Sequence, residues 1–237
     1  MKAMNSDQKT AIIVGILFLV NFVANLIGST YVEAILEKDY PDYLVDLHSN
    51  ETLVVIAELL EVMCAAALVG IAIMMLPILK RHNEHIAHGF LTFRILEAAM
   101  MVVSISFTLA LLTLSEDYDD AGTAADASYE TLGAFAVAGR YWAFKMVLIF
   151  LILGALMFYY LLYQTQLVPR FISLWALIAV TLIFGAVLLE MLGVSAFSYD
   201  EFPGTFIYLF GAPYEPVLGI WLIIKGFNPA AIDSGAT

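Results

Sequence analysis

Charged side chains lie inside stretches of this chain that are otherwise apolar enough to cross a bilayer. An ionised side chain near the centre of a bilayer is costly unless it is paired, protonated or hydrated. The sequence nevertheless keeps five acids and two bases there: Glu58, Glu61, Arg94, Glu97, Lys145, Glu190 and Glu215. Because carboxylates and guanidinium groups in such a medium bind protons, cations or anionic groups, these seven residues are the candidate ligand- or proton-binding residues.

The third apolar stretch carries two of these charges on one predicted helix face. Alternating steps of three and four residues, which align side chains along one side of a helix, join Arg94, Glu97, Met101, Ser104 and Thr108. Lipid cannot satisfy these polar groups, so we expect this face to point into a helix bundle.

The last apolar stretch carries Glu215 between Pro213 and Pro216. Proline has no backbone N–H to donate, so the pair predicts a broken helix at this point. Broken helices at membrane depth occur where they are buried in protein or line a wet cavity. The depth of Arg94 makes it the expected partner of Glu215 or Glu97.

Four further charges are predicted to share one depth near the outer side. Glu58 and Glu61 are three residues apart, and two neighbouring carboxylates in a low dielectric cannot both ionise cheaply. Lys145 and Glu190 fall at comparable positions of later stretches, so the four residues are expected to form one cluster. The alternative is that these side chains extend to the membrane interface.

Three histidines, His82, His85 and His88, recur at three-residue spacing in a short connection. Three imidazoles could bind zinc, with Glu84 assisting, but the spacing is not that of known metalloenzymes and the neighbouring residues are basic. A solvated polar turn is the favoured interpretation. The sequence has no H-E-x-x-H, nucleophile-elbow, P-loop or dinucleotide motif, so neither a metal nor a cofactor is expected.

The composition indicates that these residues belong to an integral membrane protein. The chain of 237 residues is 62% hydrophobic and 14% charged, with a mean hydropathy of +0.90. Soluble domains are about 45–50% apolar and about one-quarter charged. Apolar stretches at about 11–29, 52–79, 88–114, 141–164, 170–194 and 205–225 predict six spans. We therefore expect an all-α integral membrane protein, a bundle of six transmembrane helices in a single domain over 1–237.

The distribution of charge predicts an orientation. Most of the 22 acidic residues fall in connections on one side, chiefly in predicted outer loops at 30–51 and 115–140, where Lys38 and a juxtamembrane Arg140 are the bases. Six bases outside the predicted spans fall on the opposite side: Lys2, Lys9, Lys80, Arg81, Arg170 and Lys225. The positive-inside rule therefore predicts a multi-pass protein of the plasma membrane with both termini in the cytoplasm.

Three segments in order carry a resemblance to a known family. They are Phe93-Arg94-Ile95-Leu96-Glu97-Ala98, then Leu161-Leu162-Tyr163 with Leu167-Val168-Pro169-Arg170-Phe171, then Glu215, Leu218 and Trp221-Leu222-Ile223-Ile224-Lys225-Gly226-Phe227-Asn228. The chain resembles prokaryotic six-span membrane proteins known as a domain of unknown function, numbered four-three-eight-six. The resemblance implies charges at the positions of Arg94, Glu97 and Glu215, whereas Lys145 and the two prolines beside Glu215 depart from the family pattern. It implies no activity, cofactor or catalytic residue.

Three functional hypotheses follow. The first is a non-enzymatic membrane protein that binds or passes a small solute, lipid or proton at Arg94, Glu97, Glu215 and Glu61. The second is an intramembrane enzyme that acts on a lipid-like substrate with a glutamate as general acid or base. The third is a structural or assembly protein in which the charges join helices. The expected partners are the bilayer and a small-molecule or lipid ligand, not nucleic acid, and the sequence carries no signal for an oligomeric state.

Overall fold

The computed structural model describes residues 6–122 and 127–234, and these residues form helices and no strand. Within them, six helical segments are long and apolar enough to cross a bilayer, with mean hydropathy from 1.5 to 2.6. A helix satisfies all its backbone hydrogen bonds internally, which is what a hydrocarbon medium requires. The fold class predicted from the sequence is confirmed: this is an all-α membrane protein with six transmembrane helices.

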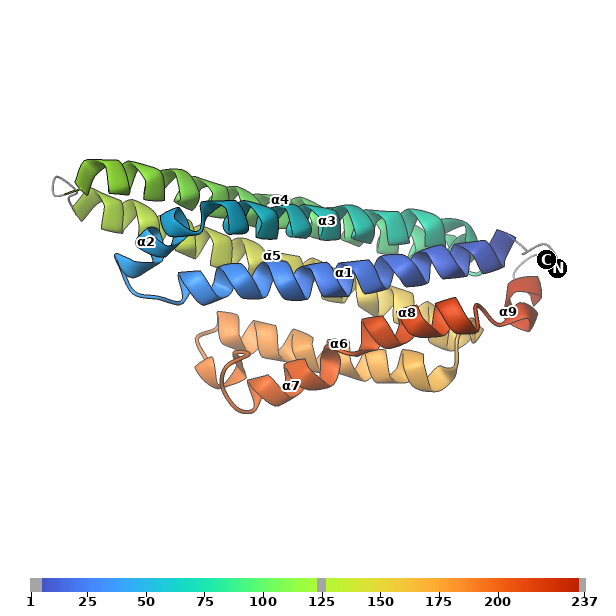
Figure 1. Cartoon of the computed structure of the whole chain (residues 1–237). Coiled ribbons are helices and arrows are strands. Elements are labelled where there is room, and N and C mark those ends of the chain that lie inside the picture. The colour runs from blue at the N-terminus through green and yellow to red at the C-terminus, as the bar shows by residue number, and fades with distance from the viewer. Residues whose placement is uncertain (1–5, 123–126, 235–237) are drawn as a thin grey trace. The chain divides into compact units, whose positions relative to one another are not determined.

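The helices follow one another with short connections (Figure 1). Their bounds are α1 Ser6–Leu36, α2 Asp42–Ser49, α3 Glu51–Lys80, α4 Glu84–Ala121, α5 Ala127–Thr165, α6 Arg170–Met191, the 3-10 turn η2 Ser195–Phe197, α7 Gly204–Gly211, α8 Tyr214–Ile224 and α9 Pro229–Ser234. The first five membrane-crossing segments are α1, α3, α4, α5 and α6, and α7 with α8 forms the sixth.

The chain divides into two compact units, and the first contains the described residues of Met1–Phe22, Ala67–Glu97 and Leu148–Thr237. Its core is aromatic and aliphatic: the rings of Phe90 and Phe158 stack at 4.6 Å, and Phe18 lies 6.3 Å from Phe158. The helices α7 and α8 pack along α6. This unit therefore combines the first part of α1 and helices α6 to α9 with residues from the middle of the sequence.

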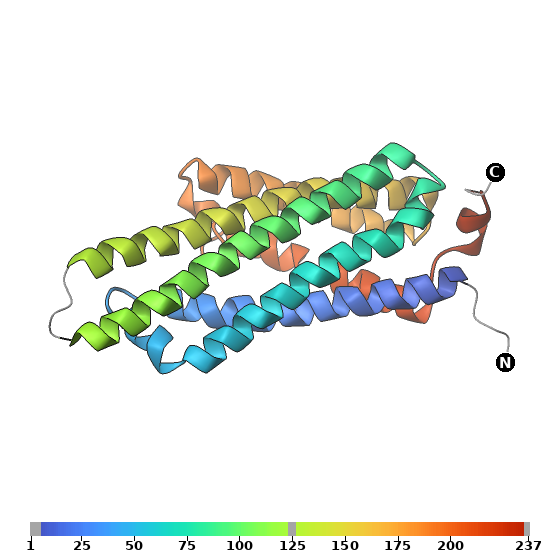
Figure 2. The ribbon, with the colours of Figure 1, turned by 90° about the horizontal axis from the view of Figure 1, so that it is seen from above.

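The second unit contains Val23–Ala66 and Ala98–Val147. Its core joins the end of α1, the short helix α2 and parts of α3, α4 and α5 around buried Leu44, Leu47 and Leu111. Figure 2 shows α2 as the short link between α1 and α3. Each of the four long helices α1, α3, α4 and α5 contributes one part to the first unit and another part to the second unit.

The connections at 30–51 and 115–140 are more helical than the sequence indicated. The helix α1 continues to Leu36, α2 occupies Asp42–Ser49, and the second segment belongs mostly to α4 and α5. Tyr118 of α4 and Tyr129 of α5 pack edge-to-face at 5.6 Å. Alanine-rich sequence, such as that after Ala127, favours helix. The contact between the two tyrosine rings stabilises α4 and α5 beyond the apolar part of each span.

The predicted break in the last span is confirmed. The helix α7 ends at Gly211, and α8 begins at Tyr214 after Pro213. Pro216 falls in the first turn of α8, where a backbone N–H has no intrahelical acceptor, so proline is tolerated there. The break places Glu215 in the first turn of a helix within the membrane-crossing segment.

Candidate buried ion-pair site

Arg94 and Glu97 form the centre of a polar group in the first unit. Arg94 is 0% exposed, and its Nη1 donates to both carboxylate oxygens of Glu97, at 3.1 and 3.0 Å. The two residues are one helical turn apart on α4, so the local helix alone brings them together. A charge-assisted bond of this kind is stronger than a neutral one and makes burial of the guanidinium tolerable.

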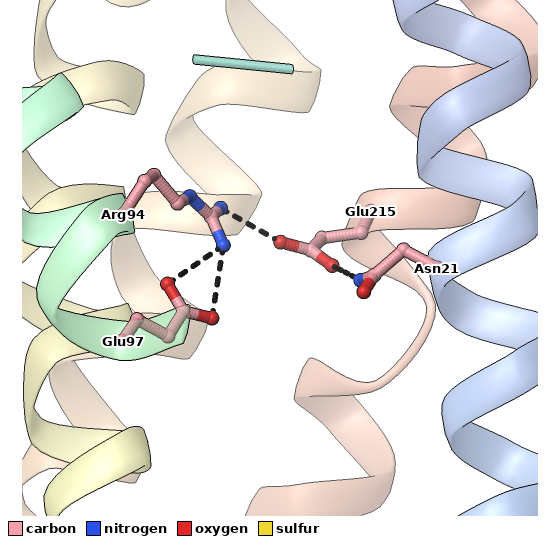
Figure 3. Close-up of polar contacts among 4 residues, drawn as sticks. All are labelled: Asn21, Arg94, Glu97 and Glu215. Atoms are coloured by element: carbon pink, nitrogen blue, oxygen red, sulfur yellow. Dashed lines mark hydrogen bonds and ion pairs between the residues drawn. The ribbon is translucent and has the colours of Figure 1, made fainter. Parts of the chain in front are cut away.

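Glu215 completes the group from the other side. Arg94 Nη2 donates to Glu215 Oε1 at 3.0 Å, and Asn21 Nδ2 donates to Glu215 Oε2 at 3.3 Å. Figure 3 shows Glu215 of α8 between Arg94 of α4 and Asn21 of α1. We call Asn21, Arg94, Glu97 and Glu215 the Arg94 group. Glu215 lies in the first turn of α8.

Glycines position α1 against α8. A Cβ added at Gly219 would lie 2.9 Å from the backbone oxygen of Gly15 and 3.1 Å from Phe18 Cβ. Glycine on both helices therefore allows their backbones to approach closely, as small residues do in membrane helix pairs. This approach brings Asn21, further along α1, to Glu215 near the start of α8.

Two buried polar atoms near this group have no hydrogen-bond partner among the described residues: Arg94 Nε and the hydroxyl of Tyr159. The Tyr159 ring lies 5.3 Å from that of Tyr214, the neighbour of Glu215, and the Arg94 guanidinium lies 5.5 Å from the centre of the Phe90 ring. Buried polar groups are normally satisfied, so these two atoms keep an unused hydrogen-bonding capacity beside the Arg94 group.

A second polar group lies in the second unit, around Arg140. Arg140 Nη1 donates to Glu58 Oε1 at 3.2 Å and to Thr108 Oγ1, and Nη2 donates to Glu61 Oε1 at 2.9 Å. All four side chains are buried, and Glu58 Oε2 has no hydrogen-bond partner within the described ranges. We call Arg140, Glu58, Glu61 and Thr108 the Arg140 group. Each unit thus buries one arginine with two glutamates.

The sequence predicts Arg140 at the membrane-facing edge of an outer loop, and the structure shows it within a helix. It lies inside α5, which begins at Ala127 rather than near residue 141, and it is the partner that Glu58 and Glu61 share. The apolar run from Leu132 to Val137 was the available signal, because it extends the span past Arg140. Asn21 is not among the seven candidate residues, because its bond to Glu215, 194 residues away, leaves no local trace in the sequence.

A family comparison adds to this geometry. The family model described as "Domain of unknown function (DUF4386)" matches residues 13–226. The chain belongs to the DUF4386 family. No curated protein and no solved structure matches it. The matched range contains both polar groups of this DUF4386 chain, and the description of the family gives no activity to assign to either.

The two remaining candidate charges of the DUF4386 domain are Lys145 and Glu190. Lys145 is buried in the second unit with its Nζ 4.8 Å from the centre of the Tyr141 ring, a cation–π contact. Glu190 is half-buried near the end of α6, in the first unit. Neither residue takes part in the hydrogen bonds and ion pairs described above for the Arg94 and Arg140 groups.

The three histidines lie where α3 turns into α4. Within the described ranges, no group of three or more His, Cys, Asp or Glu side chains is placed to hold a metal ion. His85 and His88 are exposed, whereas burial, reinforced by the charge of Arg81, lowers the pKa of His82 below its usual value. His82 therefore favours its neutral form.

Proposed function

We propose that this membrane protein binds and releases a proton at the Arg94 group, as part of binding or passing a small solute or lipid. One observation carries the proposal: a single buried guanidinium contacts two carboxylates. The positive charge of Arg94 balances one carboxylate. In a low dielectric, an uncompensated charge on the other carboxylate is costly. We therefore expect a proton or a small cation to neutralise that carboxylate.

Glu215 is the carboxyl best placed to exchange that proton. Its side chain is 12% exposed, against 1% for Glu97. It also lies beside the interruption between α7 and α8, where the chain lacks continuous helical hydrogen bonding. Interrupted helices at membrane depth are tolerated where they line a polar space, which supports a site at this position.

A structural role is the second candidate, and the contact of Arg94 with both oxygens of Glu97 favours it. In that case, the Arg94 group holds α4, α8 and α1 together and exchanges no proton. The acid–base enzyme hypothesis gains no support from these contacts, because the partners of the two carboxylates are a guanidinium and an amide.

The proposal includes an orientation. Basic residues at the start of α1, in the α3–α4 turn, at the start of α6 and at the end of α8 support a cytoplasmic location for both termini, in the plasma membrane. The acidic connection before α7 then faces outward. The proton-binding residues would lie between the two aqueous sides.

Difference infrared spectroscopy tests the proton. A protonated carboxyl group has its own C=O stretching band, which disappears on ionisation, so a pH titration of the purified protein follows it directly. We expect the parent protein to show a titrating band that Glu215→Gln or Glu97→Gln removes or shifts. Glu190→Gln is the matched control, because Glu190 is an acid of the same unit outside the Arg94 group.

If the titrating band has the same intensity and midpoint in the parent, Glu97→Gln and Glu215→Gln, the proton is not bound at the Arg94 group. The structural candidate then stands in its place. Equal loss of the band in Glu190→Gln would also contradict the assignment.

A further inference from the structure

A cavity of about 300 Å³ lies in the first unit, where the α5–α6 and α8–α9 connections meet. Two hydrogen bonds join these connections: Asn228 donates its backbone N–H to Leu167 O at 2.9 Å and its side-chain amide to Gln166 O at 3.2 Å. Gly226 turns the chain after α8 with a φ of +71°, a conformation that glycine adopts readily. The cavity is thus bordered by two hydrogen-bonded connections, and its volume lies at the lower end of the range of ligand pockets.

Two bases line this cavity, Arg170 at the start of α6 and Lys225 just after α8. Both are exposed, and neither forms an ion pair with any residue that the structure describes. The guanidinium of Arg170 lies 5.6 Å from the centre of the Tyr163 ring, which restricts its orientation. Two unpaired cations beside one cavity favour an anionic ligand with several oxygens.

The start of α6 adds to this positive potential. The first-turn N–H groups of a helix have no intrahelical acceptors, and its dipole places partial positive charge there. Pro169, which precedes α6, and Arg170, its first residue, both line the cavity. An anion in the cavity would therefore lie beside that helix end as well as beside the two side chains.

The surroundings of the cavity match the level of lipid headgroups. It lies at the ends of membrane-crossing helices, and Trp221 in its lining packs edge-on against Phe171 at 6.4 Å. Phe171 and Ile224, which adjoin the lining residues Arg170 and Lys225, are 63% and 68% exposed. Aromatic and basic residues together are typical of the membrane interface, where one ligand presents both phosphate and hydrocarbon.

We propose that this cavity binds the phosphate of an anionic phospholipid. Arg170 donates its paired N–H groups to the phosphate oxygens and Lys225 contributes a second positive charge. The acyl chains lie outside the cavity against Phe171 and Ile224. This site is separate from the Arg94 group and does not depend on the function proposed for it.

Fluorescence quenching of Trp221 tests the proposal, because this tryptophan lines the cavity. The full chain with Trp142→Phe and Trp175→Phe serves as the parent. It is titrated in detergent with phosphatidic acid carrying brominated chains. We expect saturable quenching by this lipid, and roughly tenfold or greater weakening in the double variant Arg170→Gln, Lys225→Gln. Phosphatidylcholine with the same chains should quench more weakly.

The double variant Lys9→Gln, Lys80→Gln is the matched control. It removes the same charge from two exposed bases of the same unit outside the cavity, and its titration should equal that of the parent. The conservative variant Arg170→Lys, Lys225→Arg should restore most of the binding. This comparison separates loss of charge from a folding defect.

Three results would overturn the proposal. The first is equal binding of phosphatidic acid by the parent and the Arg170→Gln, Lys225→Gln variant. The second is equal quenching by phosphatidic acid and phosphatidylcholine, which would indicate apolar contact alone. The third is displacement of the brominated lipid by an equal concentration of inorganic phosphate, which would identify a site for free anions rather than a lipid.

Discussion

Arg94 is the largest fully buried side chain in the described part of the protein, and it is charged. An isolated guanidinium could not remain at such a position, so its burial depends on the carboxylates of Glu97 and Glu215. The planar guanidinium matters as much as its charge, because Nη1 and Nη2 contact different residues. A lysine ammonium is a compact charge and cannot reproduce this geometry.

Replacement of Arg94 should therefore cost stability in a defined order. We expect Arg94→Gln to destabilise the protein by about 3–5 kcal/mol, because it leaves two buried carboxylates without a cation. Arg94→Lys keeps the charge and should cost less. Thermal unfolding in detergent measures both. Equal unfolding temperatures for Arg94→Gln and the parent would show that the pairs contribute nothing to stability.

At the scale of elements, the close approach of α1 and α8 is what brings Asn21 to Glu215. We expect Gly219→Ala to cost about 1–3 kcal/mol, because the added Cβ meets the Gly15 carbonyl, a backbone atom that cannot rotate away. Thermal unfolding measures the loss. Gly185→Ala on α6 is the control, since a Cβ at Gly185 meets nothing within 4 Å. Equal stability of Gly219→Ala and Gly185→Ala would contradict this account of the α1–α8 contact.

The elements also explain what the sequence could predict. Spacing placed Arg94 and Glu97 on one helix face, and two prolines indicated the break beside Glu215, because both are local signals. Arg140 was expected at the edge of a loop rather than as the partner of Glu58 and Glu61, because the Ala- and Gly-rich stretch before it resembles a loop. Its partners Glu58 and Glu61 are 82 and 79 residues distant. Contacts between distant helices depend on packing, which no local pattern encodes.

For the whole molecule, the orientation in the membrane is the property that governs any transport of protons or solutes. The single cysteine, Cys64, is buried, so Cys64→Ala provides a background for accessibility tests. We expect a membrane-impermeant maleimide to label Glu201→Cys, before α7, in intact cells. The same reagent should label His85→Cys, near the start of α4, only after the cells have been permeabilised. The reverse pattern would place the termini outside.

The interrupted last span also has a consequence for biogenesis. Its mean hydropathy of 1.5 is the lowest of the six, because it carries Glu215 and two prolines. A segment of this kind partitions weakly from the translocon into lipid by itself. Arg94 precedes it in synthesis by more than a hundred residues and offers Glu215 a counter-ion on arrival. Membrane integration of the final segment is therefore expected to depend on helices that are already inserted. Formation of the Arg94–Glu215 ion pair would then be a late step of assembly.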